Sequence, residues 1–546
     1  MKRQICMFII LSTLLSFHTV DAQNVVAVNN IASREVREIS VAGGKLFFNI
    51  TDSTFALSTW LTDGTDAGTL KFLPSGSIAS ISNCTESNGT IFCLLDDDNL
   101  GIELGKTDGT AAGTAVIKDI RPGAGSGNIY LSKLTINGKL LFMANDSVHG
   151  NELWVSDGTA AGTTLLKDIG AGTMNGMEGA YISRAVMFNG KVYFAGNDHA
   201  GGGYNVELWE TDGTTAGTKL VKEINPTGSA NFGYFQVYNG KLYFSATDGV
   251  NGIELWVTDG TAANTVMVKD ILPGADGFDI RSFQVYNGQL LFAVADAGFA
   301  SPTQNYSLWK TDGTAVGTVK ILDTIGYSAI VYKNSLYYSK KYADGTYGLW
   351  KTDGTIAGNQ WVADTDTGLG GNPIIGMTIS GGRLYFNTRT NDGGAIFNWA
   401  NIWVSDGTTS GTELLLPFED NIGPVYTSKG LWDFAGHLYF VGRLATPKYQ
   451  LLRTTSQSIG IEERRNTLDA RIYPNPTNGA VNITVASSLI STVSIYNLQG
   501  QVVYKETLAG QTDSHVLNTT SLSPGLYMLH VASPNGGRAI QKLIVD

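Results

Sequence analysis

The chain has 546 residues, with 48 acidic and 37 basic side chains and a net charge of −11 at pH 7. This charge repels phosphate backbones, so the composition argues against a nucleic-acid partner. The 66 glycines and the charged fraction of 16% suit an all-β chain with many turns, and the length is too great for one ordinary core.

Residues 1–22 have the features of a secretory signal peptide. Lys2 and Arg3 precede an apolar run from Ile5 to Phe17, and the small residue Ala22 precedes Gln23. A membrane anchor needs about 20 apolar residues, and neither this run nor any later stretch is that long. We therefore expect an exported protein without a transmembrane anchor.

An Asp-Gly-Thr sequence dominates the chain after this segment. It recurs eight times at intervals of 41 to 55 residues, with its Asp at Asp63, Asp108, Asp157, Asp212, Asp259, Asp312, Asp353 and Asp406. Seven copies carry a Trp three residues earlier, at Trp60, Trp154, Trp209, Trp256, Trp309, Trp350 and Trp403. Gly105 stands at this place in the other copy. Such a period indicates a repeat architecture.

Each repeat also contains a hairpin signature upstream. Around Asn239-Gly240, two alternating apolar runs flank a two-residue turn of the type I′ kind. Nine such turns occur, and each unit contains four short strands, here called a, b, c and d. Residues 23–456 are therefore predicted to form a β-propeller of about nine four-stranded blades, with eight blades as the alternative count. A solenoid or a string of small domains is the competing interpretation.

The repeats resemble the ELWxxDGTxxGT family of propeller-like repeats, found in secreted bacterial proteins. The sequence Glu254-Leu255-Trp256-Val257-Thr258-Asp259-Gly260-Thr261 carries the resemblance, which covers most of residues 36–456. It implies a fold and no defined activity.

The first unit is preceded by a segment that fits a missing strand. Val26 to Ile31 resembles strand d of the other units, for example Val266 to Ile271, and the ninth unit lacks a strand d. Because a closed ring removes unpaired sheet edges, we expect Val26 to Ile31 to complete the ninth blade.

The Asp and Trp of the repeat are predicted to be structural. The Asp is expected to accept backbone N–H groups in its own turn, where the Gly supplies positive φ. The Trp is expected to pack between blades. Stacking of the Trp ring on a glycan is the alternative, but seven identical sites would be unusual.

The mature chain retains two cysteines, which flank one hairpin. With Asn88-Gly89 as the turn, Cys84 faces Cys93 in a non-hydrogen-bonded pair with Cα atoms about 4.5 Å apart. This separation permits a disulfide, and export favours its formation. Two small buried core residues are the alternative.

The repeat also distinguishes the two ends of the blades. The a–b and c–d turns form one end, the motif face, and the b–c and d–a connections form the other, the loop face. The b–c connections of units four, six and eight are longer than the rest, at Ala195 to Val206, Val294 to Tyr306 and Asn387 to Asn401. Variable loops on a rigid frame are where binding residues concentrate, so the loop face is the candidate binding surface.

One group of residues on this face could bind a metal ion. Asp146, His149, Asp198 and His199 lie in the b–c connections of neighbouring units, and two carboxylates with two imidazoles could coordinate zinc or a similar divalent ion. Turn-forming Asn-Asp pairs with incidental histidines are the alternative.

Asp364 to Gly368 begins like a calcium loop but lacks the later ligands. No cofactor is otherwise expected.

The last part of the chain has a different pattern. A polar linker at 457–470 precedes short alternating runs at Val481 to Val485 and Thr492 to Tyr496, which indicate a small antiparallel β-sandwich. Residues 471–546 also closely resemble the type A C-terminal sorting domain of the type IX secretion system, beginning with Arg471-Ile472-Tyr473-Pro474-Asn475-Pro476. The resemblance implies partnership with that machinery, a Bacteroidetes-type host, and secretion or display at the outer-membrane surface, usually with removal of the domain.

Two functions fit these features. The first is a non-catalytic module that binds an extracellular glycan or protein. The second is an extracellular glycosidase or polysaccharide lyase that uses acidic groups on the loop face. The propeller has only three histidines, His149, His199 and His437, and no nucleophile elbow, HExxH or phosphate-loop motif, so no catalytic residue is assigned and binding is favoured.

Overall fold

The computed structural model describes residues 25–28, 35–51, 56–72, 76–274, 280–295, 306–342, 345–365, 374–389, 400–416, 430–442, 450–455, 470–485, 489–496, 502–532 and 538–546. The predicted signal peptide and residues 457–469 of the predicted linker lie outside this part, as do most of the long b–c connections of units six and eight. The chain divides into two compact units, Met1–Thr455 and Ser456–Asp546.

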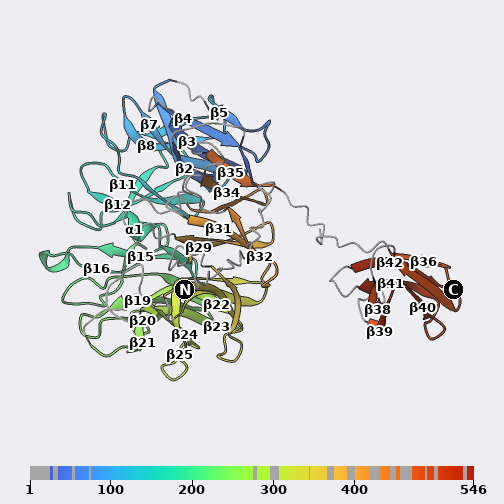
Figure 1. Cartoon of the computed structure of the whole chain (residues 1–546). Coiled ribbons are helices and arrows are strands. Elements are labelled where there is room, and N and C mark those ends of the chain that lie inside the picture. The colour runs from blue at the N-terminus through green and yellow to red at the C-terminus, as the bar shows by residue number, and fades with distance from the viewer. Residues whose placement is uncertain are drawn as a thin grey trace, which may run out of the picture. The chain divides into compact units, whose positions relative to one another are not determined.

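The first unit contains nine consecutive blades (Figure 1). The first five are four-stranded antiparallel sheets whose strands follow the chain in order. Blade 1 consists of β2 (Glu35–Ala42), β3 (Lys45–Thr51), β4 (Leu57–Thr62) and β5 (Leu70–Phe72). Blade 2 consists of β6 (Ile78–Ser87), β7 (Thr90–Asp97), β8 (Gly101–Thr107) and β9 (Ala115–Lys118). Blade 3 consists of β10 (Tyr130–Ile136), β11 (Lys139–Asn145), β12 (Asn151–Ser156) and β13 (Thr164–Lys167).

Blades 4, 5 and 8 repeat this order. Blade 4 consists of β14 (Val186–Phe188), β15 (Lys191–Asn197), β16 (Val206–Thr211) and β17 (Lys219–Lys222), with α1 (Gly179–Ile182) before it and the 3₁₀ turn η2 (Ala200–Gly202) in its b–c connection. Blade 5 consists of β18 (Phe235–Tyr238), β19 (Lys241–Thr247), β20 (Ile253–Thr258) and β21 (Val266–Lys269). Blade 8 consists of β29 (Ile374–Ser380), β30 (Arg383–Arg389), β31 (Ala400–Ser405) and β32 (Thr412–Leu416).

Blades 6 and 7 are joined in one seven-stranded sheet, which differs from the prediction of separate four-stranded blades. The sheet consists of β22 (Ile280–Tyr286), β23 (Gln289–Ala295), β24 (Tyr306–Thr311), β25 (Val319–Tyr332), β26 (Ser335–Lys341), β27 (Tyr347–Thr352) and β28 (Gln360–Asp364). β25 pairs with β24 through its first half and with β26 through its second. No proline interrupts β25, so strand d of blade 6 continues directly into strand a of blade 7.

The ninth blade contains both ends of the ring, as expected. It consists of β33 (Trp432–Phe434), β34 (His437–Gly442), β35 (Gln450–Thr454) and the N-terminal β1 (Val25–Ala27). β1 lies antiparallel to β35, with Val25 opposite Thr454 and Ala27 opposite Leu452. The prediction of a nine-bladed ring closed by the N-terminal segment is confirmed. The closing strand begins one residue earlier than predicted, and residues 29–31 lie outside the described part.

The hairpin turns adopt the backbone conformation that their sequences predict. Both central residues have positive φ in each of the nine turns, from Gly43-Gly44 to Ala435-Gly436. Positive φ at both positions is the requirement of a type I′ turn, whose twist matches that of the flanking strands. These turns fix the a–b register of every blade.

The hydrophobic cores lie between neighbouring blades. One cluster combines Phe92 and Leu104 of blade 2 with Leu140, Phe142 and Trp154 of blade 3. Equivalent clusters join blades 3 and 4 and blades 4 and 5. Each blade therefore contributes both faces of its sheet to burial, and the ring is stabilised by contacts between successive units.

The second unit is a small β-sandwich, as the alternating runs predict. A three-stranded sheet contains β36 (Ala470–Tyr473), β37 (Ala480–Val485) and β40 (Ser514–Asn518). A four-stranded sheet contains β38 (Ile490–Tyr496), β39 (Val502–Thr512), β41 (Gly525–Ala532) and β42 (Arg538–Val545). A separate core that includes Ile483, Val493 and Leu529 lies between the two sheets.

Candidate functional site

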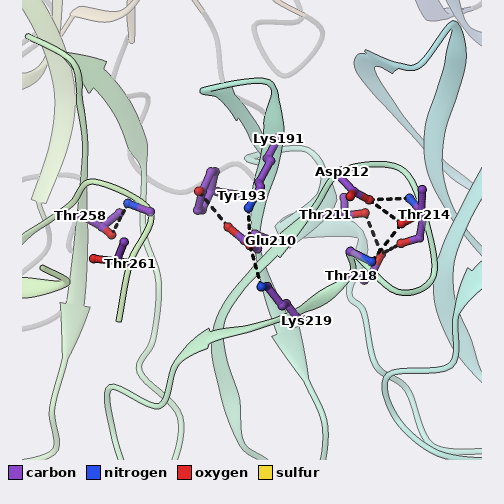
Figure 2. Close-up of polar contacts among 12 residues, drawn as sticks. Lys191, Tyr193, Glu210, Thr211, Asp212, Thr214, Thr218, Lys219, Thr258 and Thr261 are labelled. Atoms are coloured by element: carbon purple, nitrogen blue, oxygen red, sulfur yellow. Dashed lines mark hydrogen bonds and ion pairs between the residues drawn. The ribbon is translucent and has the colours of Figure 1, made fainter. Parts of the chain in front are cut away.

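The Asp-Gly-Thr turns of the motif face share the same two Asp–Thr hydrogen bonds in all eight copies. In blade 4, the backbone N–H and the hydroxyl of Thr214 donate to Asp212 Oδ1 at 2.9 and 2.6 Å, and the hydroxyls of Thr211 and Thr218 lie 2.7 Å apart (Figure 2). The bond from the Thr214 hydroxyl is the largest cause that holds the pKa of Asp212 below its ordinary value. The carboxylate is thus an acceptor for its own turn.

The turns also receive donors from the preceding blade. Lys106 Nζ of blade 2 donates to the carbonyl of Gly158 in the turn of blade 3 at 2.9 Å. The Tyr337 hydroxyl and Lys351 Nζ of blade 7 both donate to the carbonyl of Gly407 in blade 8 at 3.1 Å. The polar groups of the motif face are therefore used to join the blades.

The Trp residues of the repeat lie in the cores between blades. Trp154, Trp209, Trp256 and Trp403 are only 5 to 8% exposed, and each packs against side chains of the blade before it. Trp60, Trp309 and Trp350 are half-buried. The four buried rings offer no face to a glycan.

One buried carboxylate near the motif face, that of Glu210, has no counterpart in the neighbouring blades. Glu210 follows Trp209, where blades 3 and 5 have Val155 and Val257. Lys191 Nζ lies 2.7 Å from its Oε1, and the hydroxyl of Tyr193 donates to its Oε2 at 2.9 Å (Figure 2). Burial and this bond raise the pKa of Tyr193. Because both oxygens of Glu210 are occupied, this cluster is an internal ion pair and not a substrate site.

A second set of buried carboxylates anchors the loop face and was not predicted from the sequence. These are the Glu residues at the start of strand c in blades 2 to 5, namely Glu103, Glu152, Glu207 and Glu254. Each accepts the backbone N–H groups of the residues 17 and 18 positions later, at the start of the d–a connection. Burial raises the pKa of each to about 7. The Glu-Leu dipeptide that recurs at the start of strand c is the sequence feature from which these buried glutamates could have been predicted.

Asp146 and His149 form one turn and bind each other. Asp146 Oδ1 accepts the backbone N–H groups of Val148 and His149 at 2.9 and 2.8 Å, and its Oδ2 lies 2.7 Å from His149 Nδ1. This contact with Asp146 raises the pKa of His149. Blade 5 builds the same turn with Asp248 and Asn251, whose amide donates to Asp248 Oδ2 at 2.8 Å. His149 thus contacts the carboxylate of its turn in blade 3 in the way that Asn251 does at the corresponding position of blade 5.

Asp198 and His199 are engaged in the next loop. Asp198 Oδ1 accepts the backbone N–H of Ala200 at 3.0 Å, and His199 Nε2 lies 3.1 Å from the carbonyl oxygen of Asn175. No three His, Cys, Asp or Glu side chains within the described ranges are grouped as a metal site. Asp146, His149, Asp198 and His199 are therefore engaged with other partners in the described structure, and their role as metal ligands stays a prediction.

The loop face of blades 3 to 5 carries another feature that the sequence analysis missed. Tyr130 begins β10, Tyr204 lies in the b–c connection of blade 4 and Tyr234 in the d–a connection before blade 5. They are 50%, 51% and 41% exposed. They have no common sequence position, so only their spatial arrangement distinguishes them from ordinary loop tyrosines.

These observations define a β-propeller protein with a C-terminal sorting domain. Residues 471–546 match the family of secretion system C-terminal sorting domains, which confirms the resemblance in the sequence. The sorting domain implies secretion to the cell surface or the extracellular space. In the part of the chain with described coordinates, no helix is long and apolar enough to span a membrane.

Similar proteins include an endo-acting ulvan lyase of Formosa agariphila, which is 29% identical over 77 residues. This match covers 14% of the present chain and 15% of the lyase. PorZ, a surface component of the type-IX secretion system of Porphyromonas gingivalis, is 14% identical with a TM-score of 0.24, over 94% of this chain and 82% of PorZ. The β-propeller domain of the Trilobed protease from Pyrococcus furiosus is 12% identical with a TM-score of 0.32, over 60% of this chain and 96% of that domain. These similarities carry no activity to this chain.

Proposed function

We propose that the protein is a non-catalytic binding module whose working surface is the loop face of the propeller. The sorting domain delivers the chain to the outside of the cell, where the propeller meets an extracellular glycan or protein. The observation that carries this proposal is the contrast between the two faces of the ring.

The polar groups of the motif face are committed to the ring itself. The carboxylates of its turns accept bonds within the turn, and carbonyls such as that of Gly407 accept donors from the preceding blade. On the loop face, Tyr130, Tyr204 and Tyr234 from neighbouring blades remain half-exposed. Exposed aliphatic tips occur on both faces, at Val148 and Val250 on the loop face and at Val316 and Ile356 in motif turns, so the tyrosines carry the contrast. Exposed aromatic and apolar side chains on rigidly anchored loops are typical of binding surfaces.

An extracellular carbohydrate-active enzyme is the second candidate. This candidate is favoured only by the match to the ulvan lyase, and that match covers 14% of this chain. The carboxylates Asp146 and Asp248 are engaged in their own turns, and Glu152 and Glu254 are buried and bonded to backbone amides. Such carboxylates are poorly placed to protonate or attack a glycosidic bond, which supports binding over catalysis.

The proposal is tested with paired variants of the full chain on the two faces. Val148→Asp with Val250→Asp changes the loop face, and Val316→Asp with Ile356→Asp changes exposed positions in motif turns. Immobilised protein is exposed to extracellular polysaccharide and protein fractions, and retained material and newly formed reducing ends are measured. We expect the loop-face pair alone to reduce retention, with no bond cleavage. Loss of retention in the motif-face pair, or cleavage by the unmodified chain, would contradict the proposal.

A further inference from the structure

We infer that Tyr130, Tyr204 and Tyr234 form a binding site for a neutral oligosaccharide on the loop face of blades 3 to 5. This inference rests on the proposed binding function and specifies its ligand. The three residues are called the tyrosine crescent.

The segment from Glu178 to Arg184, which contains α1, brings the three rings together. The Tyr130 ring lies against Gly179 so closely that a Cβ at residue 179 would be 2.4 Å from its Cδ1. The Tyr204 hydroxyl donates to the carboxylate of Glu178. The guanidinium carbon of Arg184 lies 5.2 Å from the centre of the Tyr234 ring. One short segment of blade 4 thus touches rings from blades 3, 4 and 5.

Each ring is held on one side and open on another. Tyr130 rests on a glycine backbone, Tyr204 makes an edge contact with His199 at 6.4 Å, and Tyr234 lies under Arg184. All three residues keep between 41% and 51% of their surface exposed. A pyranose presents a face of C–H groups that suits such a platform, because the ring face carries negative π density. Fixed rings also lose little conformational entropy on binding.

The separation of the end rings of the tyrosine crescent requires a ligand of more than one sugar unit. Gly179 and Arg184, which contact Tyr130 and Tyr234, are five residues apart along a mostly helical path, which spans about 8 Å. A ligand that touches both end rings must be longer than one sugar. The hydroxyl groups of a saccharide can also bond to the charged groups beside the rings, the carboxylate of Glu178 at Tyr204 and the guanidinium of Arg184 at Tyr234.

The charge of the surrounding loops selects a neutral ligand. Segments 119–129, 146–150, 168–185, 198–205, 223–234 and 248–252 contain two basic residues, Arg121 and Arg184, apart from the histidines. They contain seven carboxylates, at Asp119, Asp146, Asp168, Glu178, Asp198, Glu223 and Asp248. An anionic polysaccharide would be repelled by this field.

A protein partner fits the crescent less well than a saccharide does. The centre of a protein interface is depleted in charged residues, because a charge buried without a partner is costly. Glu178 contacts Tyr204 and Arg184 contacts Tyr234, so a protein that covers these rings would have to pair or bury both charges. The hydroxyls of a sugar satisfy them without a matching charge.

The test uses the full chain, an array of neutral and anionic oligosaccharides, and calorimetric titration of the neutral oligomers that bind. Tyr130→Ala, Tyr204→Ala and Tyr234→Ala should each lower the affinity about tenfold or more, a loss of about 1.4 kcal/mol. Tyr204→Phe keeps the ring and should stay within about threefold of the unmodified chain. Trp361→Ala removes an exposed ring on β28 and should have no effect. Melting temperatures establish that each variant is folded.

The outcomes separate this inference from the proposed function. Binding of anionic glycans or of a protein only, lost in the tyrosine variants, overturns the neutral saccharide but leaves the loop face as the working surface. Binding of neutral oligomers that all three variants retain overturns the crescent. Absence of neutral oligosaccharide binding overturns the inference outright.

Discussion

A single row of residues explains why blade 2 lacks the Trp of the other blades. In blade 5, Phe235, Phe244 and Trp256 lie opposite one another across strands a, b and c. The corresponding residues of blade 2 are Cys84, Cys93 and Gly105, and the cysteines form the expected disulfide with a Cα separation of 4.2 Å. Leu95 occupies the space beside Gly105, so the disulfide and a leucine replace three aromatic rings.

Substitution of Gly105 should therefore destabilise the propeller. A Cβ at this position would lie 2.1 Å from Leu95 Cδ1 and 3.0 Å from the carbonyl oxygen of Ala115. We expect Gly105→Ala to lower the free energy of unfolding by about 1–3 kcal/mol, as overpacking does. Gly203→Ala, at a position with no atom within 4 Å of the new methyl, is the control in urea unfolding. Equal effects of the two substitutions would refute the packing explanation.

The buried glutamates should make stability depend on pH. Burial raises the pKa of Glu152 from an ordinary value of 4.5 to about 7, so the folded chain retains this proton at pH values where the unfolded chain has lost it. The resulting stabilisation is complete below about pH 4.5 and disappears as the pH rises through 7. For Glu152 the full effect amounts to about 3 kcal/mol.

Glu152→Gln tests this linkage, because glutamine does not titrate. We expect the loss of unfolding free energy between pH 5 and pH 8 to be smaller in this variant by about 2–3 kcal/mol. The absolute stability should also fall, since an amide cannot accept all three N–H groups that Glu152 accepts. Glu38→Gln, at an exposed position, should keep the unmodified pH dependence. An unchanged slope in Glu152→Gln would exclude this glutamate as the cause.

Single residues were predicted from the sequence only where their bonds are local. The Asp and Thr of each motif turn are two positions apart, so the turn could be predicted from the repeat alone. Glu152 bonds to Ile169, 17 positions away, and Tyr204 bonds to Glu178, 26 positions away. Those contacts depend on the path of the d–a connections, which no period in the sequence specifies.

At the scale of the element, β1 is the strand on which closure depends. Val25 is buried in the cluster that joins blades 8 and 9 through Ile402 and Leu438, whereas Val26 is half-buried. We expect Val25→Asp to lower the free energy of unfolding by about 2–4 kcal/mol, because it buries a carboxylate among apolar side chains. Val26→Asp should cost clearly less. Chemical unfolding of the purified proteins distinguishes them, and equal losses would show that β1 does not close the ring.

Helices and strands differ from the prediction at two d–a connections, where β25 and α1 lie. The positions of the Asn-Gly and Asp-Gly-Thr turns predicted the four-strand order of each blade. β25 was predicted as two strands because the repeat period demands a d–a connection, yet the sequence there has no Pro-Gly to end the strand. α1 lies in the d–a connection before blade 4, where four residues give no helical periodicity to detect.

At the scale of the molecule, the sorting domain should be separable from the propeller. Its core contains only residues from the second unit, such as Val481 and Leu543, and the propeller clusters contain none of them. We expect removal of residues 471–546 to leave a folded propeller in the periplasm, detected by immunoblotting of cell fractions and by its melting curve. Fusion of 471–546 to an unrelated carrier protein, which should then be exported, is the control. Normal appearance of the truncated chain outside the cell would contradict this assignment.

The closure of the ring by β1 and β35 has a consequence for biosynthesis. β1 emerges from the ribosome first among the described strands, but its partner is made only after eight blades are complete. The sorting domain follows that partner directly in the chain. A ribosome that stops early therefore releases a polypeptide with an open ring and no sorting domain, so only chains long enough to close the ring carry the sorting domain.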